Sequence, residues 1–180
     1  MLFRSQPGGV RVFDAETLEM VADVPAIDAK GAPSKTVGIV DLPFRRFAWS
    51  LLDGDEIWIG DFSESLTPKI TKFTGVGRLP YDGVATSDAR WYLAGLFGED
   101  AVARLDLWAE PMRLDKVLAG YGKGEQALPV YKMPHMEGWG ATGDYLVMPA
   151  VAHHAVLVVD RDTFALKATI PTHEIGRAHV

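Results

Sequence analysis

Four short apolar strands, each ending in an aspartate, recur along the 180 residues of this chain. The copies are Val10–Asp14, Ile57–Asp61, Val102–Asp106 and Val156–Asp160, and their aspartates stand 47, 45 and 54 residues apart. Repetition at an interval of about 45 residues is typical of proteins built from similar units placed side by side. A β-sandwich, the competing all-β fold, gives no reason for an aspartate at such regular intervals.

The surroundings of each aspartate predict a unit of four antiparallel strands, which we name A to D, with the aspartate at the end of strand C. Three units have an apolar strand B before strand C, at 47–52, 91–97 and 145–150, and a glycine-containing strand A further upstream, at 36–40, 83–86 and 137–141. After Asp14 and Asp160, the pattern Asp-x-x-Thr predicts a turn into strand D, at 20–24 and 166–170. Four such strands over about 45 residues indicate a β-propeller blade.

Helical patterns are weak, and the best of them, at 112–118, falls where a strand D belongs. The sequence therefore predicts an all-β fold, a β-propeller fragment of about three and a half four-stranded blades. We assign residues 6–173 to this partial propeller. The segments 1–5 and 174–180 resemble translated sequencing-adapter DNA, and we expect them not to belong to the natural protein. Because an open arc exposes strand edges, we also expect the arc to fold poorly by itself.

Composition narrows the classes of function. Acidic residues outnumber basic ones by 24 to 18, which argues against a nucleic-acid partner. The chain has no cysteine, which excludes disulfides, thiolate metal sites and a cysteine nucleophile. No apolar run reaches ~18 residues, so we expect no membrane span. The glycine-rich segment 120–124 fits neither a P-loop nor a dinucleotide fingerprint, so the sequence has no NAD or ATP motif.

The strand order sorts the loops onto two faces. In an antiparallel unit the B–C turns and the D–A connections lie at one end, and we name this end the D–A face. It is formed by the turns 53–55, 98–100 and 153–154 and by the connections 28–35, 76–82 and 122–135. Strand A is the inner strand of a propeller blade, so the D–A connections end near the mouth of the central channel. The chemistry-bearing residues near the starts of these inner strands are Lys35, Arg78, Tyr81, Asp82, His135 and Glu137. Cations, carboxylates, aromatic rings and a histidine around a channel mouth suit a flat, anionic, metal-containing ligand better than a sugar or a nucleotide.

Each candidate on this face has a plainer alternative. His135 is either an axial metal ligand or acid–base group over a bound macrocycle, or a histidine that caps a strand. Lys35 and Arg78 either pair with ligand carboxylates or are ordinary solvated loop residues. Tyr81 and Asp82 either donate, accept or orient a proton, or cap strand A.

Two adjacent histidines, His153 and His154, occupy a predicted hairpin turn. They are candidates to complete a metal site with His135. Adjacent residues of extended backbone point to opposite sides, however, so we favour a polar turn. The recurring aspartates are interpreted as structural, because each stands at the same turn. The tryptophans at 49, 58, 91 and 139 are interpreted as packing between blades, and Trp108 is expected to be more exposed.

Several strings resemble the NirF family of heme d1 biosynthesis proteins, which is related to the d1 domain of cytochrome cd1 nitrite reductase. They are Pro7–Glu19, Pro80–Asp82, Leu93–Asp100, Ala127–His135 and Leu157–Asp160, and the string at 131–138 is the most specific. The resemblance covers about half of a full-length family member. It implies an eight-bladed ring that binds heme d1, or a dihydro or other precursor form, on the D–A face. Lys35, Arg78, Tyr81, Asp82 and His135 would then be cofactor-binding residues.

The same resemblance implies roles for two residues and a place for the protein. His135 matches a distal histidine of the reductase, which makes it the candidate metal ligand, and Glu137 stands near it as a catalytic partner. The implied role is maturation of the nitrite reductase cofactor for denitrification, in the periplasm. The implied partners are the tetrapyrrole and nitrite reductase or other maturation proteins, and a homodimer stays open. An oxidoreductase-type step and a non-enzymatic role, as heme carrier or protein-interaction scaffold, also stay open.

Overall fold

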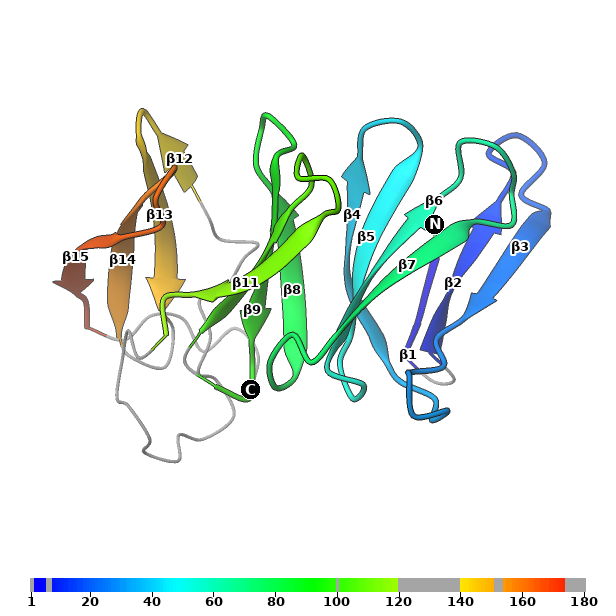
Figure 1. Cartoon of the computed structure of the whole chain (residues 1–180), viewed down its shortest axis with the longest axis horizontal. Coiled ribbons are helices and arrows are strands. Elements are labelled where there is room, and N and C mark those ends of the chain that lie inside the picture. The colour runs from blue at the N-terminus through cyan, green and yellow to red at the C-terminus, as the bar shows by residue number, and fades with distance from the viewer. Residues whose placement is uncertain (1, 6–7, 100, 120–139, 151–153, 174–180) are drawn as a thin grey trace.

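The computed structural model describes residues 2–5, 8–99, 101–119, 140–150 and 154–173. Their regular elements are all strands, arranged in four antiparallel sheets that stand side by side (Figure 1). The first sheet contains β1 (Leu2–Ser5), β2 (Gly8–Phe13) and β3 (Met20–Pro25), and the second contains β4 (Thr36–Leu42), β5 (Arg46–Leu51), β6 (Glu56–Asp61) and β7 (Lys69–Thr74). The third contains β8 (Pro80–Ala85), β9 (Trp91–Leu96), β10 (Val102–Asp106) and β11 (Arg113–Val117), and the fourth contains β12 (Gly140–Thr142), β13 (Tyr145–Ala150), β14 (Ala155–Asp160) and β15 (Leu166–Pro171).

The predicted order of strands A to D is confirmed in the second, third and fourth sheets, where each strand pairs with the next along the chain. The segment 112–118, which had the best helical pattern, contains the fourth strand of its sheet, β11. In the first sheet, β2 and β3 are the predicted strands C and D, and β1 pairs with β2 from within the segment 1–5. The all-β propeller architecture is therefore confirmed.

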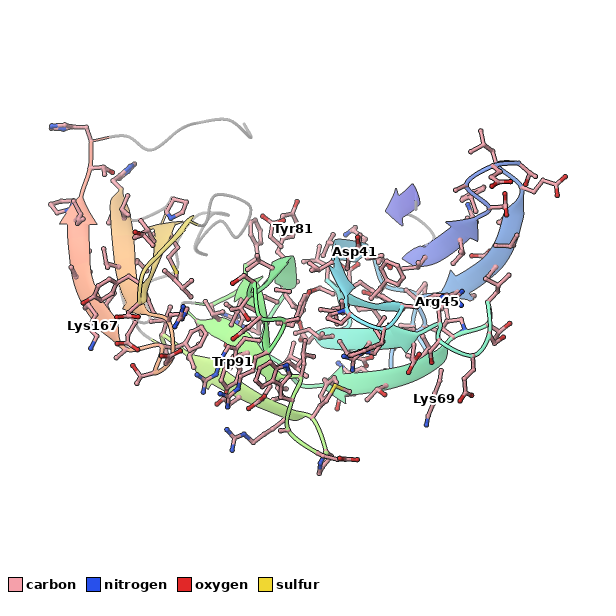
Figure 2. All side chains as sticks on the ribbon, turned by 90° about the horizontal axis from the view of Figure 1, so that it is seen from above. Asp41, Arg45, Lys69, Tyr81, Trp91 and Lys167 are labelled. Carbon is pink, nitrogen blue, oxygen red and sulfur yellow. The ribbon has the colours of Figure 1, made fainter. Side chains whose placement is uncertain are left out.

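The sheets are arranged as the blades of a propeller. Viewed from above, the inner strands β4 and β8 lie toward the hollow of an arc, and β7 and β11 follow its outer side (Figure 2). The A–B and C–D turns lie at the upper end of the sheets in Figure 1, and the B–C turns and D–A connections lie at the lower end. The lower end is the D–A face predicted from strand order.

Apolar side chains fill the spaces between neighbouring sheets. Val10 of the first sheet packs with Trp49 and Trp58 of the second. The second and third sheets share a larger cluster, which includes Ile57 and Tyr92. A third cluster, joining the third and fourth sheets, contains Trp91, Leu93, Leu146, Met148, Leu157 and Phe164. Since burying one such side chain stabilises a fold by about 1.5–3 kcal/mol, these clusters hold neighbouring blades together.

The tryptophans follow the sequence interpretation where the structure describes them. Trp49, Trp58 and Trp91 are buried between sheets, whereas Trp108 is 64% exposed in the turn after β10. Trp139 lies outside the described residues. Within the part of the chain that is described, no helix has the length and apolar character needed to cross a membrane.

The recurring aspartates occupy equivalent positions at, or directly after, the ends of the strands C. Asp14 Oδ1 accepts hydrogen bonds from the backbone N–H groups of Glu16 and Thr17, at 2.9 and 2.8 Å. Asp160 Oδ1 accepts the equivalent bonds from Asp162 and Thr163, at 3.2 and 2.9 Å. Each of the other two copies has one such bond: the backbone N–H of Ser63 donates to Asp61 Oδ1, and that of Trp108 donates to Asp106 Oδ1. The aspartates therefore have the structural role expected of them, as acceptors that close the turn after strand C.

The hydrogen bonds around Asp160 make this turn sensitive to acid. Bonds from the Thr163 backbone and hydroxyl lower the pKa of Asp160 to about 2, below the ~3.9 of an unfolded chain. Because the folded pKa is the lower one, the stabilisation is present above about pH 4 and is lost as the pH falls toward 2.

We therefore expect Asp160→Asn to reduce the dependence of the unfolding free energy on pH between 4 and 2, measured by urea unfolding. Asp162→Asn removes the same charge from the same turn and is the matched control. A slope that changes equally in both variants would contradict the assignment to Asp160.

Candidate functional site

In the second and in the third sheet, backbone hydrogen bonds join the D–A connection to the B–C turn of the same blade. Leu52 N donates to Lys35 O at 2.9 Å, and Phe97 N donates to Leu79 O at 2.8 Å. Gly98 N donates to Arg78 O at 3.0 Å. The connection that leads into an inner strand is therefore fixed to the hairpin turn of the same blade. Lys35 and Arg78 lie at this end of the sheets, on the D–A face, and Tyr81 and Asp82 follow as the second and third residues of β8.

Lys35 immediately precedes the inner strand β4 and is held by Asp53. Its backbone N–H donates to Asp53 Oδ2 at 3.1 Å, and its Nζ donates to Asp53 Oδ1 at 3.2 Å. Ser34 Oγ accepts the N–H groups of Asp53 and Gly54, at 3.0 and 3.1 Å, which holds the turn in place. Lys35 is therefore an ordered, half-exposed cation that already has a counter-ion.

Arg78 precedes β8 and contacts the B–C turn of the third sheet. Its Nη2 donates to Gly98 O, and its Nε lies 3.9 Å from Glu99 Oε2. The other oxygen of Glu99 forms an ion pair with Lys116 Nζ on β11. The side chain of Arg78 is 67% exposed, so its guanidinium remains open to a solute on this face.

Tyr81 and Asp82 lie at an irregularity in the inner strand β8. The pairing of β8 with β9 shifts register between Pro80 and Gly83, which places both residues in a β-bulge. Bulges occur often beside functional sites, because they redirect side chains. The Tyr81 ring lies 5.5 Å from that of Phe97, tilted by 31°, and Tyr81 lies on the hollow side of the arc (Figure 2). Asp82 is only 7% exposed, so its carboxylate is surrounded by protein atoms and not by solvent.

Tyr92 of β9 connects the third sheet to the second and was missed by sequence reasoning. Its hydroxyl lies 3.3 Å from Ser50 Oγ on β5 and donates to Gly38 O of β4 at 3.2 Å. Burial raises the pKa of Tyr92, and the negative charge of Asp82 raises it further, so the hydroxyl stays protonated. The continuous apolar run 91–97 could have identified Tyr92 as buried, but not its hydrogen-bond partners on another blade.

Glu56 is a second buried polar group without a sequence signal. The side chain is 2% exposed at the start of β6. Its Oε1 accepts the N–H of Ala29 at 2.7 Å, and its Oε2 accepts the indole N–H of Trp58 at 2.7 Å. Glu56 therefore fixes the connection 28–35, which ends at Lys35, to the core of the second sheet.

Glu56→Gln is expected to destabilise the protein by about 1–3 kcal/mol. Both oxygens of Glu56 accept a hydrogen bond, whereas a glutamine offers one acceptor oxygen and one NH₂ group. One donor, from Ala29 or Trp58, would then be buried opposite another donor. Urea unfolding measures the loss, and the exposed Glu64→Gln is the control. Equal stability of both variants would contradict this role for Glu56.

The remaining predicted site residues, His135 and Glu137, lie outside the described residues, as does His153. His154 is exposed in the turn between β13 and β14, with a positive φ of 47°. Among the residues that the structure describes, no three or more histidine, cysteine or acidic side chains are grouped to hold a metal ion.

Residues 4–177 match the family of the cytochrome D1 heme domain. The chain therefore belongs to this family of heme-domain β-propellers. Within the family it is similar to NirF. Protein NirF of Stutzerimonas stutzeri is 52% identical over 167 residues, which make up 92% of this chain and 43% of that protein. Protein NirF of Pseudomonas aeruginosa is 52% identical over 157 residues, or 86% of this chain and 40% of that protein. The chain thus spans about two fifths of the length of these curated relatives.

Solved structures support the fold. Dihydro-heme d1 dehydrogenase NirN, in complex with DHE, superposes with a TM-score of 0.70 at 20% identity, over 95% of this chain and 35% of that one. Sqt1 of Saccharomyces cerevisiae superposes with a TM-score of 0.68 at 13% identity, over 96% of this chain and 44% of that one. At these identities the likeness establishes the propeller architecture alone.

Proposed function

We propose that this chain is part of a propeller that binds heme d1, or a late precursor of it, and acts in heme d1 biosynthesis. The observation that carries the proposal is that Lys35, Arg78, Tyr81 and Asp82 all lie at or just before the starts of β4 and β8, two neighbouring inner strands, in a member of the d1 heme domain family. The names of the similar proteins point the same way, since two are NirF and one is a dihydro-heme d1 dehydrogenase.

The described residues suit a flat ligand that carries carboxylates. The rings of Tyr81 and Phe97 lie 5.5 Å apart and offer an aromatic surface beside the inner strand. Lys35 and Arg78, from the connections into two neighbouring inner strands, offer charge-assisted hydrogen bonds to carboxylates. Asp82 lies in the same bulge as Tyr81 and can orient a proton-bearing group.

Two residues outside the described part complete the proposed site. His135 would bind the heme iron through its imidazole, and Glu137 would exchange a proton beside it. His135 precedes Thr142 by the same number of residues as Lys35 precedes Leu42. This equal spacing supports a position for His135 at the channel mouth. When bound, a d1-type heme supplies the iron centre and the conjugated ring, whereas these residues orient it and hold protons.

The biological setting is proposed from the family. We place the protein in the periplasm, acting on the cofactor of nitrite reductase, with that enzyme or other maturation proteins as partners. An oxidoreductase-type step on the macrocycle is the favoured activity, and carriage of the finished or nearly finished cofactor is the alternative.

Absorption spectroscopy tests the proposal on the full-length protein. Addition of heme d1 or of its dihydro precursor is expected to shift the Soret band in a saturable way. Conversion of the dihydro form to heme d1, with an added electron acceptor, would identify an enzyme, and binding without conversion would identify a carrier. Absence of any spectral change with either tetrapyrrole would contradict the proposed function.

A further inference from the structure

We infer that Asp53 and Glu99 set the ligand affinity of the D–A face, because they neutralise Lys35 and Arg78, two of the cations that this face offers to an anionic ligand. Lys35 and Arg78 are predicted to pair with ligand carboxylates, yet each lies against a carboxylate of the B–C turn in its own blade. Where the ligand is a tetrapyrrole, the inference rests on the proposed function. Asp53 and Glu99 are then specificity-determining residues that compete with the ligand.

Asp53 is the more firmly placed of the two. Its Oδ2 accepts the Lys35 backbone N–H, its Oδ1 accepts Lys35 Nζ, and its own N–H donates to Ser34 Oγ. The carboxylate is therefore fixed beside the ammonium group by bonds that do not depend on the ion pair. A ligand carboxylate must share Lys35 with Asp53 at close range or displace it.

Glu99 neutralises two cations at once. One oxygen lies 3.9 Å from Arg78 Nε and the other pairs with Lys116 Nζ, and the carboxylate is 25% exposed. Loss of its charge leaves both cations without this counter-ion. Glu99 is less exposed than Asp53, whose side chain is 44% exposed, but Arg78 is more exposed than Lys35 and lies further from its carboxylate. We therefore expect removal of either carboxylate to have an effect of similar size.

The size of the effect follows from the strength of partly exposed ion pairs. Such pairs are weak, and each corresponds to a factor of up to about five in an equilibrium constant. A ligand with one negative charge gains little by displacing a carboxylate, whereas a ligand with several carboxylates can engage both cations together. The counter-ions thus favour a polycarboxylate over small anions.

Asp53→Asn and Glu99→Gln in the full-length protein test the inference. Each variant keeps an acceptor oxygen, so the Lys35 N–H retains a partner in Asp53→Asn, and thermal unfolding checks that both variants fold. We expect each to bind heme d1 about two- to fivefold more tightly, measured by Soret titration, and to bind succinate more tightly, measured by amide chemical shifts. The matched controls, Asp144→Asn and Glu64→Gln, remove the same charges from the opposite face and are expected to leave both affinities unchanged.

The two probes separate the two ideas. One outcome is that the wild-type protein binds heme d1, but Asp53→Asn and Glu99→Gln bind heme d1 and succinate with unchanged affinity. This outcome would overturn the inference and leave the proposed function standing. Tighter succinate binding in both variants, with no heme d1 binding in any protein, would support the counter-ion role and contradict the proposed function. Equal tightening in the control variants would overturn the inference, because net charge alone would then explain it.

Discussion

Replacing His135 with alanine in the full-length protein is expected to weaken heme d1 binding at least about tenfold and to change the spectrum of any heme that still binds. The reason is that the imidazole of His135 would be a ligand of the heme iron, and loss of an iron ligand would change both the affinity and the electronic spectrum. Soret titration measures the affinity, and the spectrum at saturation reports the change of ligation.

His153→Ala is the matched control, because it removes the same side chain from the neighbouring B–C turn. We interpret this turn as polar and solvent-facing, and the exposure of His154 beside it agrees with that interpretation. His153→Ala is expected to change heme affinity less than about twofold. Equal effects of the two substitutions, or no effect of His135→Ala, would show that another group binds the iron.

The propeller fold could be predicted because its signals are local. Asp14 and Asp160 bind N–H groups two and three residues ahead, so the turn after strand C is encoded within four residues. Strand order then follows from short turns, since antiparallel neighbours joined by such turns have little choice of partner. The grouping of loops on the D–A face needed only this order.

The contacts within the site could not be predicted in the same way, because they join residues far apart in sequence. Placing Lys35 and the turn 53–55 on one face did not reveal that Asp53 holds Lys35 by two hydrogen bonds. That pairing depends on how the connection 28–35 lies over the turn. The bulge in β8 was not predicted either, since the sequence placed Tyr81 and Asp82 in the connection before strand A, whereas they lie within β8.

The close approach of the inner strands was also invisible in the sequence, and it rests on Gly38. Gly38 has a φ of 60°, in the left-handed region that side chains disfavour. A Cβ atom there would lie 2.4 Å from Tyr81 O and 2.8 Å from Gly83 N, which are backbone atoms of β8. The carbonyl oxygen of Gly38 also accepts the Tyr92 hydroxyl. A side chain at this position would therefore push β4 away from the bulge that carries Tyr81 and Asp82.

Gly38→Ala is accordingly expected to reduce the free energy of unfolding by about 2–4 kcal/mol, from backbone strain and from overpacking between blades. Gly75→Ala is the matched control, because Gly75 has a similar φ of 64° with nothing within 4 Å of an added Cβ, and we expect it to cost about 1 kcal/mol. Urea unfolding of both variants separates the contact from the backbone strain that they share. If the two substitutions cost the same, β4 and β8 can separate freely at Gly38, and their close approach does not hold Tyr81 and Asp82 in place.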